Sequence, residues 1–109
     1  MQEKQLFFIK DGNTIHRLKQ EQIIYIAVED KYCTIYTFQG KRFILRKSLK
    51  NISKVLAPQS FTQIHRSHIV TVIYIDVIDL KQNRIKICNR WFPIGRSFKQ
   101  VLIKKINPL

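Results

Sequence analysis

Residues 61–70 read Phe-Thr-Gln-Ile-His-Arg-Ser-His-Ile-Val and join two strand-like ends to a polar centre. The apolar residues Phe61 and Ile64 precede the centre, and Ile69 and Val70 follow it. The centre, 65–68, is polar throughout, and its two histidines and one arginine can carry positive charge. An apolar strand interrupted in this way is not typical of a simple core strand. It indicates a rigid β scaffold that presents hydrogen-bond donors to an anionic partner.

The chain before this stretch has the pattern of an antiparallel β-meander. Asp11-Gly12 between two apolar runs is a hairpin signal, because glycine accepts the positive φ of a tight turn. Ile23–Val28 is too continuously apolar for a half-exposed strand, which predicts burial on both faces. The predicted strands of this part are Gln5–Ile9, Thr14–Leu18, Ile23–Val28, Tyr32–Phe38 and Phe43–Leu45.

Two segments change to helical periodicity. Ser48 is a candidate N-cap for a helix over 49–56 that Pro58 ends, and a second amphipathic helix is predicted over 97–106. Further strands are predicted at 61–75, 77–78, 84–87 and 91–94. Strands and helices do not alternate as they do in parallel α/β proteins. We therefore expect a mostly β, antiparallel fold with two short α-helices, and a single domain over 1–109.

The charge is strongly positive. The chain has 20 Lys+Arg against 7 Asp+Glu, a net charge of +13. No acidic residue occurs between Lys31 and Ile75, and none occurs after Asp79. Long spans without acids leave the positive field uncompensated, which favours a polyanionic partner such as nucleic acid or an anionic membrane. The alternative is a lysine-rich surface with no specific partner.

The cysteines and the apolar runs bear on location. Cys33 and Cys88 lie in strand-like surroundings without metal-ligand spacing, so two reduced, buried thiols are expected. No signal peptide precedes them, and no apolar run is long enough to cross a bilayer. The sequence thus predicts a cytoplasmic protein, without membrane insertion.

No constellation of residues points to catalysis. The carboxylates show no paired spacing, and the glycines stand alone rather than in a phosphate-binding loop. His65 and His68, three apart on one strand, would point to opposite faces and so would not share a metal. We expect no catalytic site, no metal site and no cofactor.

Several motifs, taken in order, resemble the LytTR domain, a family of DNA-binding output domains of bacterial transcription regulators in two-component systems. The resemblance extends from about residue 6 to 106. It implies elongated antiparallel β-sheets with two helices. The matching segments are Ile23–Val28, Asp30-Lys31-Tyr32, Leu49–Leu56, Phe61-x-x-Ile64-His65-Arg66-Ser67-x-Ile69-Val70 and Phe92-Pro93-Ile94-Gly95-Arg96.

The resemblance implies that loops between strands enter successive major grooves of double-stranded DNA. The matching loops are Lys31 and Tyr32, then His65-Arg66-Ser67, then Gly95-Arg96. We further expect two copies to bind a direct repeat. The chain is then either the output domain of a longer regulator, with a receiver domain or signalling partner outside it, or a naturally short protein.

Individual residues have competing interpretations. Arg96 either solvates the N-terminal end of the last helix or makes a bidentate contact to guanine, and the contact is favoured because that end is electropositive. Arg66 either reads sequence or holds a phosphate, and phosphate is favoured. Ser67 can donate to phosphate, and His68 is expected to pack. Tyr32 is either a half-buried strand residue or a base contact, and His65 either orients its loop or contacts DNA. Gly95 would let the backbone approach DNA at the cost of a looser loop, whereas Lys47 and Lys50 read as background charge.

Two other functions remain open at this point. An RNA-binding or single-strand-binding β-domain would use exposed aromatic rings as stacking platforms, with Tyr36 and Trp91 as the candidates. A basic peripheral membrane or protein-interaction module would bind anionic surfaces without sequence preference.

Overall fold

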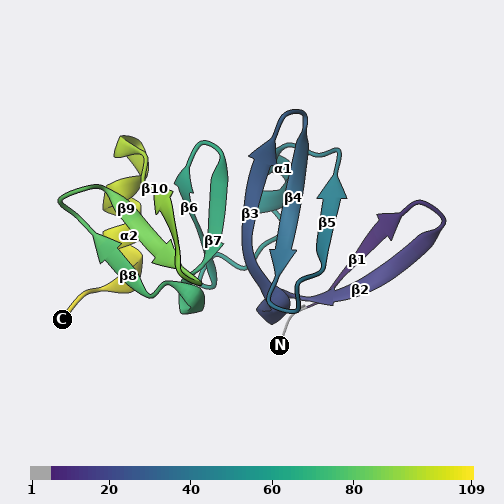
Figure 1. The fold of residues 1–109 in the computed structure, drawn as a ribbon, viewed down its shortest axis with the longest axis horizontal. Coiled ribbons are helices and arrows are strands. Elements are labelled where there is room, and N and C mark those ends of the chain that lie inside the picture. Colours follow the sequence, from purple (N-terminus) through teal and green to yellow (C-terminus); the bar gives the residue numbers. More distant parts are fainter. Residues whose placement is uncertain (1–5) are drawn as a thin grey trace.

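The computed structural model describes residues 6–109, so Gln5 of the first predicted strand lies outside the described residues. The molecule is elongated, with principal extents of 46 × 36 × 24 Å (Figure 1). The helices are α1 (Leu49–Ser53) and α2 (Lys99–Ile106), with the 3-10 turns η1 (Gln20–Gln22), η2 (Val72–Tyr74) and η3 (Arg96–Phe98). The strands are β1 (Leu6–Asp11), β2 (Thr14–Lys19), β3 (Ile23–Glu29), β4 (Tyr32–Thr37), β5 (Arg42–Leu45), β6 (Phe61–His65), β7 (His68–Thr71), β8 (Val77–Asp79), β9 (Arg84–Ile87) and β10 (Arg90–Pro93).

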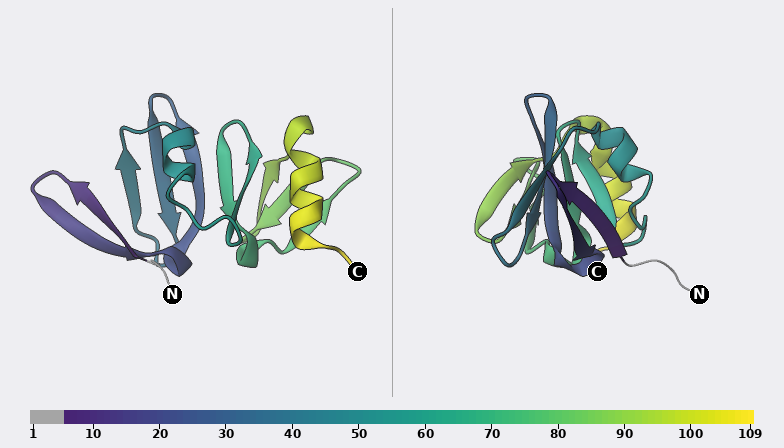
Figure 2. Two further views of the ribbon diagram at one scale, coloured as in Figure 1. Left: turned by 180° about the vertical axis from the view of Figure 1, so that it is seen from behind. Right: turned by 90° about the vertical axis from the view of Figure 1, so that its right-hand side faces the viewer.

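All strand pairs within 6–109 are antiparallel, which confirms the predicted mostly β fold class. The hairpin β1–β2 forms a sheet of its own, and the central sheet has the order β5-β4-β3-β7-β6. A third sheet has the order β10-β9-β8. The hairpin lies at one end of the long axis, and the third sheet with α2 lies at the other (Figures 1 and 2).

The central sheet buries both of its faces, as the run Ile23–Val28 predicts. Ile26 belongs to one cluster of buried side chains, whereas its neighbours Tyr25 and Ala27 belong to another. This division follows from the alternation of side chains along a strand. β3 therefore supplies residues to two cores on opposite faces of one sheet.

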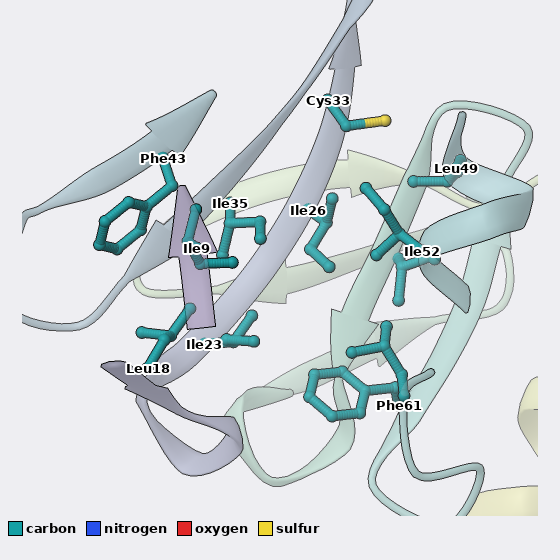
Figure 3. Packing of buried hydrophobic residues seen from close by; sticks show 12 residues of the cluster. Ile9, Leu18, Ile23, Ile26, Cys33, Ile35, Phe43, Leu49, Ile52 and Phe61 are labelled. Atoms are coloured by element: carbon teal, nitrogen blue, oxygen red, sulfur yellow. The ribbon is translucent and has the colours of Figure 1, made fainter. Parts of the chain in front are cut away.

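We call these clusters the first and the second core. The first core lies between the central sheet, the β1–β2 hairpin and α1 (Figure 3). Its contributions from the covering elements include Ile9, Leu18, Leu49 and Ile52. The second core lies between the other face of the sheet, the third sheet and α2, and the third sheet and α2 contribute Ile85, Ile87, Phe92 and Leu102.

Helix α1 begins where the sequence predicts and ends earlier. The Ser48 hydroxyl accepts a hydrogen bond from the Asn51 N–H at 3.1 Å, which makes Ser48 the N-cap. The regular helix ends at Ser53, because the next turn tightens into bonds from the Val55 and Leu56 N–H groups to carbonyls three residues back. Leu56 is still buried in the first core.

Two further predictions were wrong. The strand region predicted over 61–75 ends at Thr71, where η2 begins, and the turn at Arg66–Ser67 lies where the resemblance placed a loop. Cys33 is buried as predicted, but Cys88 is exposed. Cys88 and Asn89 have φ values of 50° and 63° and form the tight turn between β9 and β10. A two-residue turn with both φ values positive matches the twist of a hairpin, and it places the thiol outside the core.

Candidate nucleic-acid interface

Three turns meet at one edge of the molecule, which we call the loop edge. They are the β3–β4 turn at Asp30–Lys31, the β6–β7 turn at Arg66–Ser67 and the junction of β10 with η3 at Gly95–Arg96. All three lie at the upper edge in Figure 1, and the view from behind in Figure 2 agrees. The three predicted DNA-reading loops are therefore neighbours in space, although they are far apart in the sequence.

Backbone hydrogen bonds fix these turns relative to one another. The Val28 N–H donates to the Ser67 carbonyl at 2.9 Å, which joins the end of β3 to the β6–β7 turn. The Gly95 N–H donates to the Ile64 carbonyl at 2.7 Å, which joins the third turn to the end of β6. The β6–β7 turn is therefore the central element, with a neighbouring turn held on either side.

The first turn opens onto a hollow of about 410 Å³ that also reaches the second turn. Asp30 adopts a φ of 61°, and the exposed side chain of Lys31 follows it. Tyr32 is half-buried, and the Arg46 guanidinium carbon lies 5.6 Å from the centre of its ring. Lys31, Tyr32, Arg46, Lys47 and Arg66 all line this hollow.

Arg46 and Lys47 were missed as site residues. From the sequence, both residues contribute to the positive charge, and Lys47 reads as background charge. They lie between the end of β5 and the N-cap Ser48, so the start of α1 carries them to the loop edge. Their position directly between a predicted strand and a predicted N-cap was the available signal.

Contrary to the sequence prediction, His65 and His68 do not lie on opposite faces of one strand. His65 ends β6 and His68 begins β7, so the two residues are cross-strand partners whose ring centroids lie 5.6 Å apart. The Ser67 N–H donates to His65 Nδ1 at 3.2 Å, so the imidazole holds the turn that exposes Arg66. A side-chain acceptor for a turn N–H takes the role that a backbone carbonyl has elsewhere.

His68 packs inward, as expected. Its ring meets the edge of Phe92 at a centroid distance of 5.4 Å. Burial lowers the pKa of His68, and the neighbouring charges of His65 and Arg90 lower it further. Although His65 and His68 are adjacent, residues 6–109 contain no cluster of three or more His, Cys, Asp or Glu side chains that could hold a metal ion.

The third turn is more tightly packed than the glycine suggested. A Cβ added at Gly95 would lie 3.0 Å from the Phe98 ring and 3.6 Å from the His65 Cα. The Phe98 N–H also donates to the Gly95 carbonyl at 3.0 Å. Gly95 has an ordinary φ of −70°, so the position needs glycine for its lack of a side chain rather than for flexibility. The close packing around Gly95 argues against the looser loop that the glycine suggested.

Arg96 is exposed at the start of η3 and lines a small hollow with Asn83 and Lys99. The Lys99 ammonium is held there by bonds to Asn83 Oδ1 at 2.8 Å and to the Leu80 carbonyl at 3.3 Å. Arg96 thus extends the positive loop edge toward the third sheet. This hollow is distinct from the one that Lys31 and Arg66 line.

Two acidic residues lie at or beside the first turn of the loop edge, Asp30 within the turn and Glu29 at the end of β3. Glu29 accepts hydrogen bonds from Tyr36 Oη at 2.6 Å and from Thr34 Oγ1 at 2.9 Å. These two bonds, led by that from Tyr36, lower the Glu29 pKa. The one ion pair among residues 6–109 joins Arg84 to Asp79 in the third sheet at 3.6 Å. The cations of the loop edge are therefore not neutralised by ion pairs within the described part of the chain.

The two candidate stacking platforms are partly covered. Tyr36 stacks on Tyr25 at a centroid distance of 4.4 Å, and its hydroxyl is bonded to Glu29. The Arg84 guanidinium lies 3.9 Å from the centre of the Trp91 ring. Each ring has a face already in use, which disfavours base stacking as the main mode of binding. None of the helices in 6–109 is long and apolar enough to cross a membrane.

Known proteins resemble this chain in sequence and in fold. A response regulatory protein of Vibrio cholerae, itself uncharacterized, is 39% identical over 70 residues, which are 62% of this chain and 27% of that protein. The chain therefore spans less than a third of the length of this relative. The LytTr DNA-binding domain of a Bacillus cereus protein, described as a methyl-accepting/DNA response regulator, superposes with a TM-score of 0.82. The superposition covers 97% of this chain and 100% of that one at 21% identity, so the likeness concerns the fold.

The model of a protein family, described as LytTr DNA-binding domain, matches residues 13–107 of this chain. The matched range includes all the elements that build the loop edge. Only β1 and the ends of the chain lie outside it. This chain belongs to the LytTr DNA-binding domain family.

Proposed function

We propose that this chain is the DNA-binding output domain of a transcription regulator and that its loop edge contacts double-stranded DNA. One observation carries the proposal. Lys31, Arg66 and Arg96 extend from three turns that backbone hydrogen bonds hold along a single edge. Donors on a rigid β scaffold are already ordered before binding, so little conformational entropy is lost when they meet a duplex.

We assign the cationic side chains of the loop edge to two kinds of DNA contact. Lys31, Arg46, Lys47 and Arg66 surround one hollow and are assigned to the phosphate backbone, where each contact positions the protein without reading sequence. Arg96, apart from them, is assigned to a guanine edge in the major groove. Ser67 can add a phosphate contact, and Tyr32 a contact to a base edge.

His65 and Gly95 are assigned supporting roles. His65 accepts the Ser67 N–H and so shapes the turn that presents Arg66. Gly95 lets the third turn pack against β6. Neither role needs direct contact with DNA.

Its relatives suggest the larger setting. The name of the Vibrio cholerae relative supports a receiver domain or other signalling partner beyond this chain. We infer binding of two copies to a direct repeat, a cytoplasmic location and no catalytic activity.

The experiment begins with selection of bound sequences from a random duplex pool. Arg96→Ala and Arg66→Ala are then titrated against the selected duplex and a scrambled duplex at several salt concentrations. Loss of Arg96 should cost about 1–3 kcal/mol on the selected site and much less on scrambled DNA. Loss of Arg66 should weaken both duplexes by a similar factor and flatten the salt slope by about one unit.

Two results would contradict the proposal. If Arg96→Ala weakens every sequence equally, Arg96 does not read a base. A salt slope near zero for the unmodified chain would remove the electrostatic basis of duplex binding, because each phosphate contact contributes about −0.9 to that slope.

A further inference from the structure

An open apolar groove lies on the first-core side of the molecule, away from the second core. It has a volume of about 610 Å³ and is walled by β1, the end of β5 and α1 with the turn after it. The buried side chains of Ile23, Ile35 and Ile52 contribute to its lining, and Figure 3 labels all three, Ile23 and Ile35 on the sheet and Ile52 on α1. The groove is an incomplete part of the first core.

Three apolar side chains at the edges of the groove are left exposed by the rest of residues 6–109. Phe8 on β1, Ile44 on β5 and Val55 after α1 are 67%, 63% and 63% exposed. Single exposed apolar residues are ordinary, but a group from three elements around one hollow marks a binding surface.

The charged lining of the groove is of one sign. Among residues 6–109, Lys10, Arg46 and Lys47 line it, and no acidic side chain does. A second copy of this chain would bring a net charge of +13 to this rim, so self-association there is opposed electrostatically. The occupant that fits has an apolar body and a negative end.

We propose that the groove binds a free amphiphilic carboxylate, with its chain or ring on the apolar floor and its carboxylate on Arg46 and Lys47. The volume lies within the roughly 300–1,000 Å³ typical of small-molecule sites. The composition also fits such a site, in which apolar walls supply affinity and a few charged groups fix orientation. Arg46 offers a planar fork that matches a carboxylate.

The same two residues connect the groove to the loop edge. Arg46 and Lys47 line both the groove and the hollow that contains Lys31 and Arg66. A carboxylate bound to them removes positive charge from the surface assigned to DNA phosphates. This consequence rests on the proposed function, and it makes the ligand an antagonist of DNA binding.

The test uses dodecanoate as the probe, with dodecan-1-ol as the neutral control of equal chain length. Calorimetry measures binding without DNA, and NMR shifts of the Ile44 and Val55 methyl groups report the place. Val55→Asp puts a carboxylate against the apolar body and should weaken dodecanoate binding about tenfold or more. Val101→Asp is the matched control, because Val101 is 54% exposed on α2, outside the groove.

The expected result is one saturable dodecanoate site with shifts confined to the groove, lost in Val55→Asp and kept in Val101→Asp. Equal binding of dodecan-1-ol would overturn the anionic class. Shifts spread over the basic surface, equal in both variants, would show unspecific ion binding only. Binding of an acidic amphipathic peptide but not of dodecanoate would assign the groove to a polypeptide and also overturn the proposal.

DNA binding is measured separately. Saturating dodecanoate should weaken binding to the selected duplex and flatten the salt slope by about one to two units. If dodecanoate binds in the groove and DNA affinity is unchanged, the groove site stands and the antagonism is wrong. If the chain does not bind duplex DNA at all, the proposed function fails while the groove result remains.

Discussion

The two faces of the central sheet are covered very differently. The second core is closed by a three-stranded sheet and the eight-residue α2, and its residues Ile64, Ile85 and Leu102 are 0% exposed. The first core is covered by a hairpin and the five-residue α1, and it leaves an apolar groove open. One sheet therefore supports both a sealed core and an unfinished one.

Because of this difference, the residues of the loop edge rest on two kinds of support. Gly95 and His65 are packed together beside the second core, so the second and third turns rest on closely packed structure. Arg46 and Lys47 are carried by the start of α1, on the side of the open groove. We infer that the sealed side fixes the base-reading geometry and that the open side can be modulated.

The largest expected effect compares the same substitution in the two cores. Leu102→Ala should lower the free energy of unfolding by about 3–5 kcal/mol, because a cavity in a sealed core cannot collapse or fill with water. Leu56→Ala, at a buried residue that borders the groove, should cost about 2–3 kcal/mol, because the space left by the side chain can open to the groove and fill with solvent. Urea denaturation of both variants measures the difference, and equal losses would contradict the comparison.

Replacement of Gly95 by Ala tests the packing between the second and third turns. The new Cβ would lie 3.0 Å from the Phe98 ring, so the turn or the ring has to move. We expect a loss of about 1–3 kcal/mol in stability, the usual cost of overpacking, together with weaker DNA binding. Unchanged Tm and unchanged affinity would mean that the turn is loose after all, as the sequence alone suggested.

The fold was predictable where local pattern and tertiary environment agree. The continuous apolar run 23–28 predicted a strand buried on both faces, and Ser48 predicted the start of α1. The residue pattern alone did not mark the break at 66–67, because the polar centre between apolar ends carries no Gly, Pro, Asn or Asp, and only the resemblance placed a loop there. Its turn is held instead by His65, and a histidine acceptor leaves no local signature.

The site was only partly predictable, because part of it also depends on tertiary contacts that leave no local sequence signature. The resemblance placed Lys31, Arg66 and Arg96 on turns, and the structure brings those turns to one edge. The resemblance could not show that Arg46 and Lys47 also lie at the loop edge, since their position depends on how α1 packs on the sheet. The exposure of Cys88 also depends on the positive φ values of Cys88 and Asn89. The apolar residue Ile87 before them suggests a continuing buried strand instead.

His65→Ala separates support from contact at the second turn. Loss of the imidazole leaves the Ser67 N–H without its acceptor, which should cost about 1–3 kcal/mol of stability. DNA affinity per folded molecule should largely survive. Unchanged stability with lost DNA binding would show instead that His65 touches DNA.

The smallest expected effect is a pH dependence from His68. Burial lowers its pKa below the usual 6.5 in the folded protein, whereas the unfolded chain is protonated as the pH falls through that value. The unfolded state then binds more protons, so the free energy of unfolding should fall as the pH drops from about 6.5 to the folded pKa. His68→Phe should remove this part of the dependence. An identical pH profile in the variant would show that His68 is not its source.

The central claim is that the loop edge binds DNA. It is tested most directly by comparing substitutions of two lysines at opposite ends of β4. Lys31 precedes β4 at the loop edge, and Lys41 follows it at the far end. Both are exposed, and a strand of six residues separates them by about 20 Å, well beyond the screening length of about 10 Å at 0.1 M salt.

Each lysine is replaced by glutamine, and affinity for the selected duplex is measured by fluorescence anisotropy across a salt series. Lys31→Gln should weaken binding and reduce the salt slope by about 0.9, while Lys41→Gln leaves both nearly unchanged. Equal losses in the two variants would mean that overall charge, and not the loop edge, holds the DNA.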